Sequence, residues 1–127
     1  MENLSDATAI EAASLNSKAK GNDSYKQGNI QEAIAHFTDA IELDCSNSTF
    51  FCNRALCYYS MKDWAKCVDD AIRAIKLSKK YEKAYFHCVK ALLELGANKD
   101  ARLFLSTALK VRTNYMEAWE LAIYKVD

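Results

Sequence analysis

A repeat with a period of about 34 residues is the feature that most restricts how this chain can fold. Small or apolar residues recur at this offset in four sets, namely Gly21, Ala55 and Val89; Ala33, Cys67 and Ala101; Phe37, Ala71 and Leu105; and Ala40, Ala74 and Ala108. This period is typical of stacked helix pairs, because one pair is too small to bury its own apolar face. Such stacks expose a long groove, so we expect binding of a peptide or a partner's tail and not catalysis.

Helical spacing of apolar residues and residues suited to helix ends predict six helices. Their expected ranges are 8–28, 29–43, 49–61, 63–77, 82–95 and 98–111. Thr8 and Glu11 have the spacing of a capping box, which would place the first helix start there. Gly28, Lys62 and Gly96 follow one another at the repeat period and mark equivalent turns. Since no hairpin or period-two signal occurs, the predicted fold is all-α, with three antiparallel helix pairs.

A seventh helix is expected after the third pair, at 115–126. Its apolar residues form one stripe, consisting of Met116, Trp119, Ile123 and Val126. A helix of this kind would cover the open end of the stack, which otherwise exposes the core. We therefore expect one domain over 1–127, with repeats at 14–47, 48–81 and 82–115.

Charge and composition exclude several classes of partner. The 127 residues contain 17 basic and 17 acidic side chains, so the net charge offers no general attraction to nucleic acid or to anionic membranes. Residues 1–13 contain acidic residues and no long apolar run, which argues against a signal peptide or a membrane span. Selectivity for a charged ligand must then come from local patterning.

The cysteines and histidines indicate neither disulfides nor a cofactor. Five cysteines without a C-x-x-C pair are typical of reduced thiols, and we expect a cytoplasmic protein. With only His36 and His87 available, and no finger-like spacing, we expect no metal and no other cofactor. His36 lies beside Phe37 on the second helix of its pair, and we assign it no role.

Several residues resemble a known family. Gly21, Ala33, Phe37, Ala40 and Tyr58 look like signature positions of the tetratricopeptide repeat (TPR). The segments Lys20-Gly21-Asn22 and Asn53-Arg54-Ala55 resemble the more specific carboxylate-clamp, or co-chaperone, subclass. That resemblance implies that the first helix of each pair lines a concave face. It also implies that five side chains there, two lysines, two asparagines and an arginine, bind the C-terminal carboxylates of heat-shock chaperones.

Four of these five positions match the subclass. They are Lys18, Asn22, Asn53 and Lys83, and the fifth, four residues after Lys83, is His87 in place of arginine. An unperturbed histidine, with a pKa of ~6.5, is only about one-quarter protonated at neutral pH, whereas arginine is always charged. We therefore expect a weakened clamp and, if His87 faces the carboxylates, an affinity that rises as the pH drops from about 8 to about 6.

The residue types also suit this ligand on physical grounds. A peptide that ends in an acidic residue carries two carboxylates close together, which need cationic donors and neutral amide donors. Lys18 and Asn22 lie one helical turn apart, as do Lys83 and His87, so each pair can face one anion. A handful of charge-assisted contacts predicts a salt-sensitive complex with at most a roughly micromolar affinity, about −8 kcal/mol.

Four further residues near the same stripe are possible groove contacts. Tyr25, Leu56 and Phe86 could hold apolar side chains upstream of the tail, although packing between repeats also explains the aromatic residues. Lys90, one turn beyond His87, could partly replace the missing arginine charge.

Two functions follow as hypotheses. The first is a co-chaperone type adaptor that captures the acidic tail, Glu-Glu-Val-Asp in the family, of the seventy-kilodalton or ninety-kilodalton heat-shock chaperones, or both. The second is a TPR scaffold with a degenerate clamp, which binds an internal helix or assembles with another protein. We expect no enzymatic activity. Cys52 and His87 could be considered as a nucleophile and its base, but they would lack both an orienting acid and an oxyanion motif.

Overall fold

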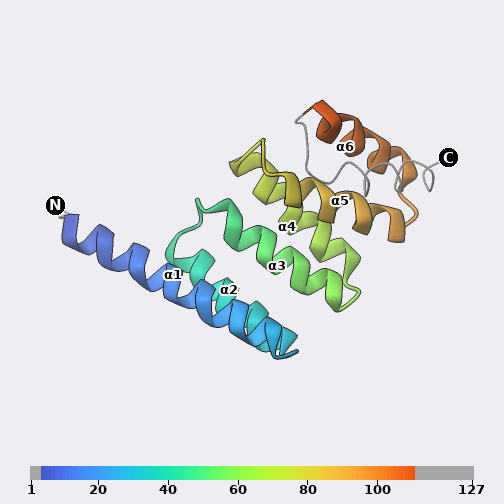
Figure 1. Ribbon diagram of the computed structural model, residues 1–127. Helices are drawn as coiled ribbons and strands as arrows, with labels where there is room; N and C mark the ends of the chain where they lie inside the picture. The colour runs from blue at the N-terminus through green and yellow to red at the C-terminus, as the bar shows by residue number, and fades with distance from the viewer. Residues whose placement is uncertain (1–3, 111–127) are drawn as a thin grey trace.

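Six α-helices follow one another in a computed structural model of the chain, which describes residues 4–110 (Figure 1). They are α1 (Leu4–Lys26), α2 (Ile30–Leu43), α3 (Ser48–Ser60), α4 (Trp64–Leu77), α5 (Glu82–Glu94) and α6 (Asn98–Lys110). No strand occurs in this range, so the predicted all-α fold is confirmed. None of these helices has an apolar stretch long enough to cross a membrane.

The helices form antiparallel pairs that stack in chain order, as Figure 1 shows. Within the pairs, α1 contacts α2, α3 contacts α4, and α5 contacts α6. Between the pairs, α3 also contacts both α1 and α5. The first helices of the three pairs therefore form one continuous surface, which we call the first-helix face.

Two expectations from the sequence remain untested. The capping helix at 115–126, with Met116, Trp119, Ile123 and Val126, lies outside the described residues. The single domain over 1–127 and its repeat boundaries also stay a prediction.

Five of the six expected helix starts lie within one residue of those in the structure, although Asn29 precedes α2 without a side-chain cap bond. Asn47 precedes α3 and accepts a hydrogen bond from the Thr49 N–H at 3.0 Å, and Asp63 caps α4 through the Lys66 N–H at 3.3 Å. The exception is α1, which begins at Leu4, so the expected start at Thr8 is wrong. Good helix formers surround Thr8, and Asp6 in the first turn favours an earlier start at the positive end of the helix dipole.

Within each helix pair the same turn recurs. At Gly28, Lys62 and Gly96 the backbone is left-handed, with φ of 82°, 62° and 75°. Each N–H bonds the carbonyl three residues back, and the following N–H bonds the carbonyl five residues back, which is a Schellman motif. The three turns predicted to be equivalent are thus confirmed, and of the three only Lys62 adopts this conformation with a Cβ.

Small residues allow the paired helices to approach closely. The repeated positions Ala33, Ala40, Cys67, Ala71, Ala74, Ala101 and Ala108 are all fully buried. At Gly21 the approach leaves no room for a side chain, since a Cβ there would lie 2.6 Å from the Phe37 ring. The repeat pattern in the sequence is therefore the pattern of helix-to-helix contact.

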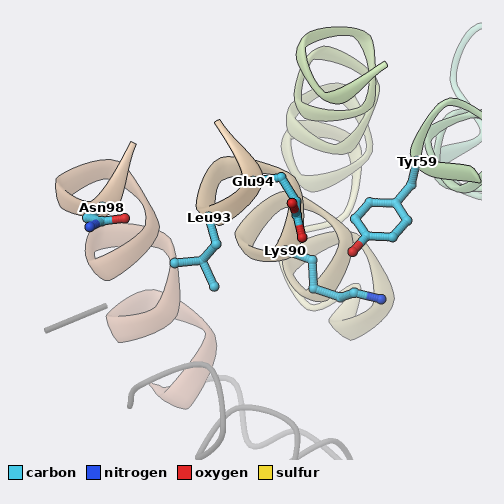
Figure 2. Close-up of a pocket in the computed structure, with 5 residues that line it drawn as sticks. All are labelled: Tyr59, Lys90, Leu93, Glu94 and Asn98. Atoms are coloured by element: carbon cyan, nitrogen blue, oxygen red, sulfur yellow. The ribbon is translucent and has the colours of Figure 1, made fainter. Parts of the chain in front are cut away.

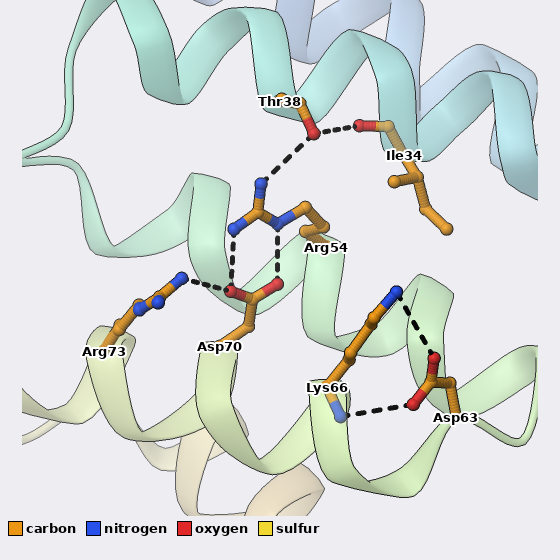
Figure 3. Close-up of polar contacts among 7 residues, drawn as sticks. All are labelled: Ile34, Thr38, Arg54, Asp63, Lys66, Asp70 and Arg73. Atoms are coloured by element: carbon orange, nitrogen blue, oxygen red, sulfur yellow. Dashed lines mark hydrogen bonds and ion pairs between the residues drawn. The ribbon is translucent and has the colours of Figure 1, made fainter.

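A buried ion pair joins three helices on the side of α3 that faces α2 and α4 (Figure 3). Asp70 on α4 is 2% exposed and accepts two hydrogen bonds from Arg54 on α3, from Nε at 2.6 Å and from Nη2 at 2.8 Å. The Nη1 of Arg54 donates to the hydroxyl of Thr38 on α2 at 3.1 Å. Because both charges are satisfied, the pair is tolerated in the core and fixes how these helices meet.

The left-handed turn at Lys62 predicts a stabilising substitution. Lys62→Gly should raise the free energy of unfolding by up to about 1 kcal/mol, because glycine avoids the left-handed penalty and loses part of that gain to its more flexible unfolded state. Urea denaturation measures the change. Gly28→Ala is the matched control and should destabilise the chain, whereas a stabilising effect there would contradict the assignment.

The buried pair predicts a large loss when one partner is removed. Arg54→Leu leaves the Asp70 carboxylate with only the longer contact to the exposed Arg73, at 3.5 Å, and should lower the free energy of unfolding by about 3 kcal/mol. Combining it with Asp70→Leu should recover most of that loss in thermal or urea denaturation.

An exposed ion pair provides the control for this experiment. Lys66 lies 3.8 Å from Asp63, with both side chains largely in solvent. Lys66→Leu should change stability by less than about 1 kcal/mol. If Arg54→Leu and Lys66→Leu change the free energy of unfolding equally, the buried pair contributes no more to stability than the exposed one.

Candidate functional site

All nine residues that the sequence singles out lie on the three first helices. They are Lys18, Asn22 and Tyr25 on α1; Asn53 and Leu56 on α3; and Lys83, Phe86, His87 and Lys90 on α5. Because α3 contacts both neighbours, residues from all three helices can share the first-helix face. The contacts of each residue decide how far they converge.

Asn22 and Asn53 meet directly. The Nδ2 of Asn53 on α3 donates to the Oδ1 of Asn22 on α1 at 3.2 Å. Each carboxamide carries two N–H donors, so this bond leaves both donors of Asn22 and one of Asn53 for a ligand. Lys18 is half-buried one turn before Asn22, and among the described residues no side-chain hydrogen bond or ion pair ties it to the other candidates.

Lys83 acts electrostatically on both α3 and α5. Burial raises the pKa of Cys52 on α3 to about 12, against the opposing effects of a hydrogen bond with Tyr81 and of the Lys83 charge. The same charge helps to lower the pKa of His87 on α5. Lys83, which belongs to α5, therefore also lies near α3. The Cys52 thiol stays protonated at neutral pH and cannot act as a thiolate nucleophile.

The surroundings of His87 favour the neutral imidazole. Burial lowers its pKa to about 4, and the charges of Lys90 and Lys83 act in the same direction. Its Nδ1 is buried and has no hydrogen-bond partner among the described residues. The expectation of one-quarter protonation at neutral pH is thus wrong, because it assumed a solvated ring far from other cations.

Lys90 is held by two aromatic rings. Its Nζ lies 4.3 Å from the ring centroid of Tyr59 on α3 and 4.8 Å from that of Phe86 on α5. Lys90 also lines a pocket of about 190 Å³ together with Tyr59, Leu93, Glu94 and Asn98 (Figure 2). In Figure 2 the lysine side chain reaches toward Tyr59, and the carboxylate of Glu94 lies at the same pocket.

The apolar candidates contribute partly to packing. The ring of Tyr25 packs against the cluster of Ala33, Phe37 and Cys57, and its hydroxyl lies 3.2 Å from the Ser60 hydroxyl on α3. Phe86 packs against the core, and Leu56 is half-buried. Each of them leaves part of its surface accessible, so packing and ligand contact are compatible here.

Sequence reasoning did not identify Tyr59 as the partner of Lys90. Tyr59 follows Tyr25 by one repeat period, so the repeat places both at equivalent positions of α1 and α3. This equivalence is the signal in the sequence that could have identified Tyr59 as a site residue. The cation contact could not be derived from it, because it depends on how α5 packs beside α3.

Three lysines on this face have no carboxylate partner among residues 4–110. The ion pairs of this range involve other cations, at His36, Arg54, Lys66 and Arg73, and leave out Lys18, Lys83 and Lys90. Ammonium groups without such a partner, next to carboxamide donors, are suited to bind an anion with several oxygens. Within the same range no group of three or more potential metal ligands comes together.

Comparison with known proteins identifies relatives for most of the chain. The family model described as TPR repeat matches residues 21–62. Serine/threonine-protein phosphatase 5 of Rattus norvegicus is 35% identical over 101 residues, which cover 80% of this chain and 20% of the phosphatase. The chain thus spans about a fifth of the length of the curated relative.

Solved structures cover the chain more fully. The first TPR of Spaghetti (RPAP3), bound to the HSP90 peptide SRMEEVD, is 30% identical, with a TM-score of 0.84 and coverage of 91% of each chain. The second TPR domain of human RPAP3, in complex with the HSP70 peptide SGPTIEEVD, is 25% identical, with a TM-score of 0.81 and coverage of 92% of this chain and 94% of that one. Repeat period, helix stacking and these relatives agree, and the chain belongs to the tetratricopeptide repeat family.

Proposed function

We propose that the chain is a protein-binding adaptor of the co-chaperone type, which captures the acidic C-terminal tail of the HSP70 and HSP90 heat-shock chaperones on its first-helix face. The observation that carries this proposal is a set of lysines without a carboxylate partner in residues 4–110, Lys18, Lys83 and Lys90, beside the linked carboxamides of Asn22 and Asn53. Two similar TPR domains hold peptides that end in Glu-Glu-Val-Asp.

The donors match the charge of such a tail. Its last residue has a main-chain and a side-chain carboxylate, and each oxygen accepts hydrogen bonds. Lys18 and Lys83 supply charged donors from α1 and α5, and the free N–H groups of Asn22 and Asn53 supply neutral donors between them. Neutral amides add donors without adding repulsion between cations.

Upstream residues of the tail contact apolar surface in this proposal. Tyr25, Leu56 and Phe86 lie on the same three helices and are only half-buried. Apolar side chains of the peptide would cover their accessible parts, which adds affinity that does not depend on salt.

No catalytic role belongs to this proposal. Four of the five cysteines are buried, and burial raises the pKa of each of these four, Cys52, Cys57, Cys67 and Cys88, to about 12. The similarity to the phosphatase covers only a fifth of that enzyme. The free thiols fit a reducing compartment, so we place the adaptor in the cytoplasm as part of the same proposal.

One observation favours a second function. His87 is neutral where the subclass has a charged arginine, which weakens the clamp. A scaffold that binds an internal helix or another protein through apolar contacts would tolerate this change. The two functions differ in their dependence on salt and on a free C-terminal carboxylate.

Titration of the peptide SRMEEVD into the chain tests the first function. We expect a dissociation constant near micromolar, about −8 kcal/mol, that weakens with added salt. Amidation of the peptide C-terminus or Lys83→Ala should each weaken binding about tenfold, on the scale of one charge-assisted hydrogen bond. Lys76→Ala, an exposed lysine on α4, is the matched control.

The same calorimetric titration can refute the proposal. If the free and amidated peptides bind equally to the wild type and to Lys83→Ala, the carboxylate is not recognised. Salt-independent binding of an amphipathic helix would then favour the scaffold function.

The charge state of His87 gives a separate prediction. In the free chain the imidazole should titrate with a midpoint of about 4, because burial and the charges of Lys90 and Lys83 disfavour protonation. NMR of the ring resonances, assigned with a His36→Gln variant, measures it. Bound peptide carboxylates should raise this midpoint, since they stabilise the imidazolium.

Two results would contradict this account of His87. A midpoint near 6.5 in the free chain would mean that the ring is solvated. A midpoint that bound peptide leaves unchanged would place His87 away from the carboxylates.

A further inference from the structure

The position of the Lys90 ammonium is set by the direction of its side chain. In an α-helix the Cα–Cβ bond tilts toward the N-terminus, so a long side chain lies over the preceding turn. Phe86 is four residues before Lys90, and the Nζ of Lys90 lies 4.8 Å from its ring centroid. The charge therefore lies beside the turn that carries His87.

A second contact fixes this charge between two helices. The Nζ of Lys90 lies 4.3 Å from the ring centroid of Tyr59 on α3. Aromatic faces attract an ammonium group but do not occupy its hydrogen-bond donors in the way that a carboxylate does. Tyr59 in turn packs edge-on against Trp64, at 5.0 Å between ring centroids, which limits its freedom to move away.

The acid that lines the pocket, Glu94, forms no ion pair with Lys90. Glu94 lies one turn further along α5 and lines the same pocket, yet none of the ion pairs in the described part of the chain joins it to Lys90. The lysine points back along the helix to the rings, so its charge stays available on the first-helix face. The electrostatic effect of Lys90 on His87 is consistent with this position.

We propose that Lys90, held between the rings of Tyr59 and Phe86, supplies to the carboxylate site the cationic charge that the family places four residues after Lys83. His87, which occupies that family position, then serves as a neutral neighbour. This inference rests on the proposed function, because it assumes that the first-helix face binds a peptide C-terminus.

Variants at three positions, with Lys76→Gln as the control, test the inference with the peptide SRMEEVD and the whole 127-residue chain. Lys90→Gln should weaken binding about fivefold, comparable with other single ionic contacts, whereas Lys76→Gln should not. Tyr59→Leu should weaken binding in the wild type but add little to Lys90→Gln, because the ring acts through the lysine. Glu94→Gln should strengthen binding, since it removes a nearby negative charge.

A rescue experiment separates a role of Lys90 in binding from a purely structural role. His87→Arg returns the charge to the family position, so it should restore the affinity that Lys90→Gln loses. In the wild-type background the same substitution should gain less, because Lys90 already fills the role. Circular dichroism and urea denaturation should show that each variant remains folded.

Three outcomes would overturn the inference. Unchanged affinity of Lys90→Gln, while Lys83→Ala and C-terminal amidation still weaken binding, would reject Lys90 and leave the proposed function intact. Lys90→Gln could instead lower the affinity for the amidated peptide as well, but not for a peptide whose upstream glutamates are replaced by glutamine. That result would show that Lys90 binds an upstream acid. Insensitivity to Lys83→Ala, amidation and Lys90→Gln together would reject the proposed function as well.

Discussion

Close approach between helices at small side chains is the constraint on which this structure depends. Gly21 lies so near the Phe37 ring that a Cβ there would be only 2.6 Å away, and the repeated alanines of the pairs are fully buried. Helices that approach this closely leave little freedom in their relative orientation. The repetition of close contact in each pair therefore places α1, α3 and α5, which carry all the candidate ligand-binding residues, next to one another.

Two neighbouring residues of α3 show how the scaffold and the site share one helix. Asn53 points toward α1 and bonds Asn22, whereas Arg54 bonds Asp70 on α4 and Thr38 on α2. The largely buried Arg54 is paired with Asp70, whereas within residues 4–110 the three lysines of the first-helix face have no carboxylate partner. Charge thus fixes the orientation of α3 on one side and remains available for a ligand on the other.

The sequence predicted the helices and turns well, because these depend on local periodicity and caps. It failed where a property depends on packing between helices. The start of α1 was misplaced at Thr8, since neighbouring helix formers outweighed the capping pattern. The neutral state of His87 could not be derived, because it results from burial and from two lysines whose positions only the fold defines. Asp70 did leave a signal, as an acid within the apolar stripe of α4 that required a buried partner.

The neutral histidine and the ring-bound lysine are best understood together. An arginine at position 87 would place a permanent charge beside both Lys83 and Lys90, and repulsion among three cations would oppose the free, ligand-less fold. Histidine relieves that repulsion by losing its proton, which burial already favours. The rings of Tyr59 and Phe86 meanwhile stabilise Lys90 as a cation without consuming its donors. Under the proposed function, the face would therefore keep its charge for an incoming anion while avoiding a further cation alongside Lys18, Lys83 and Lys90 in the absence of ligand.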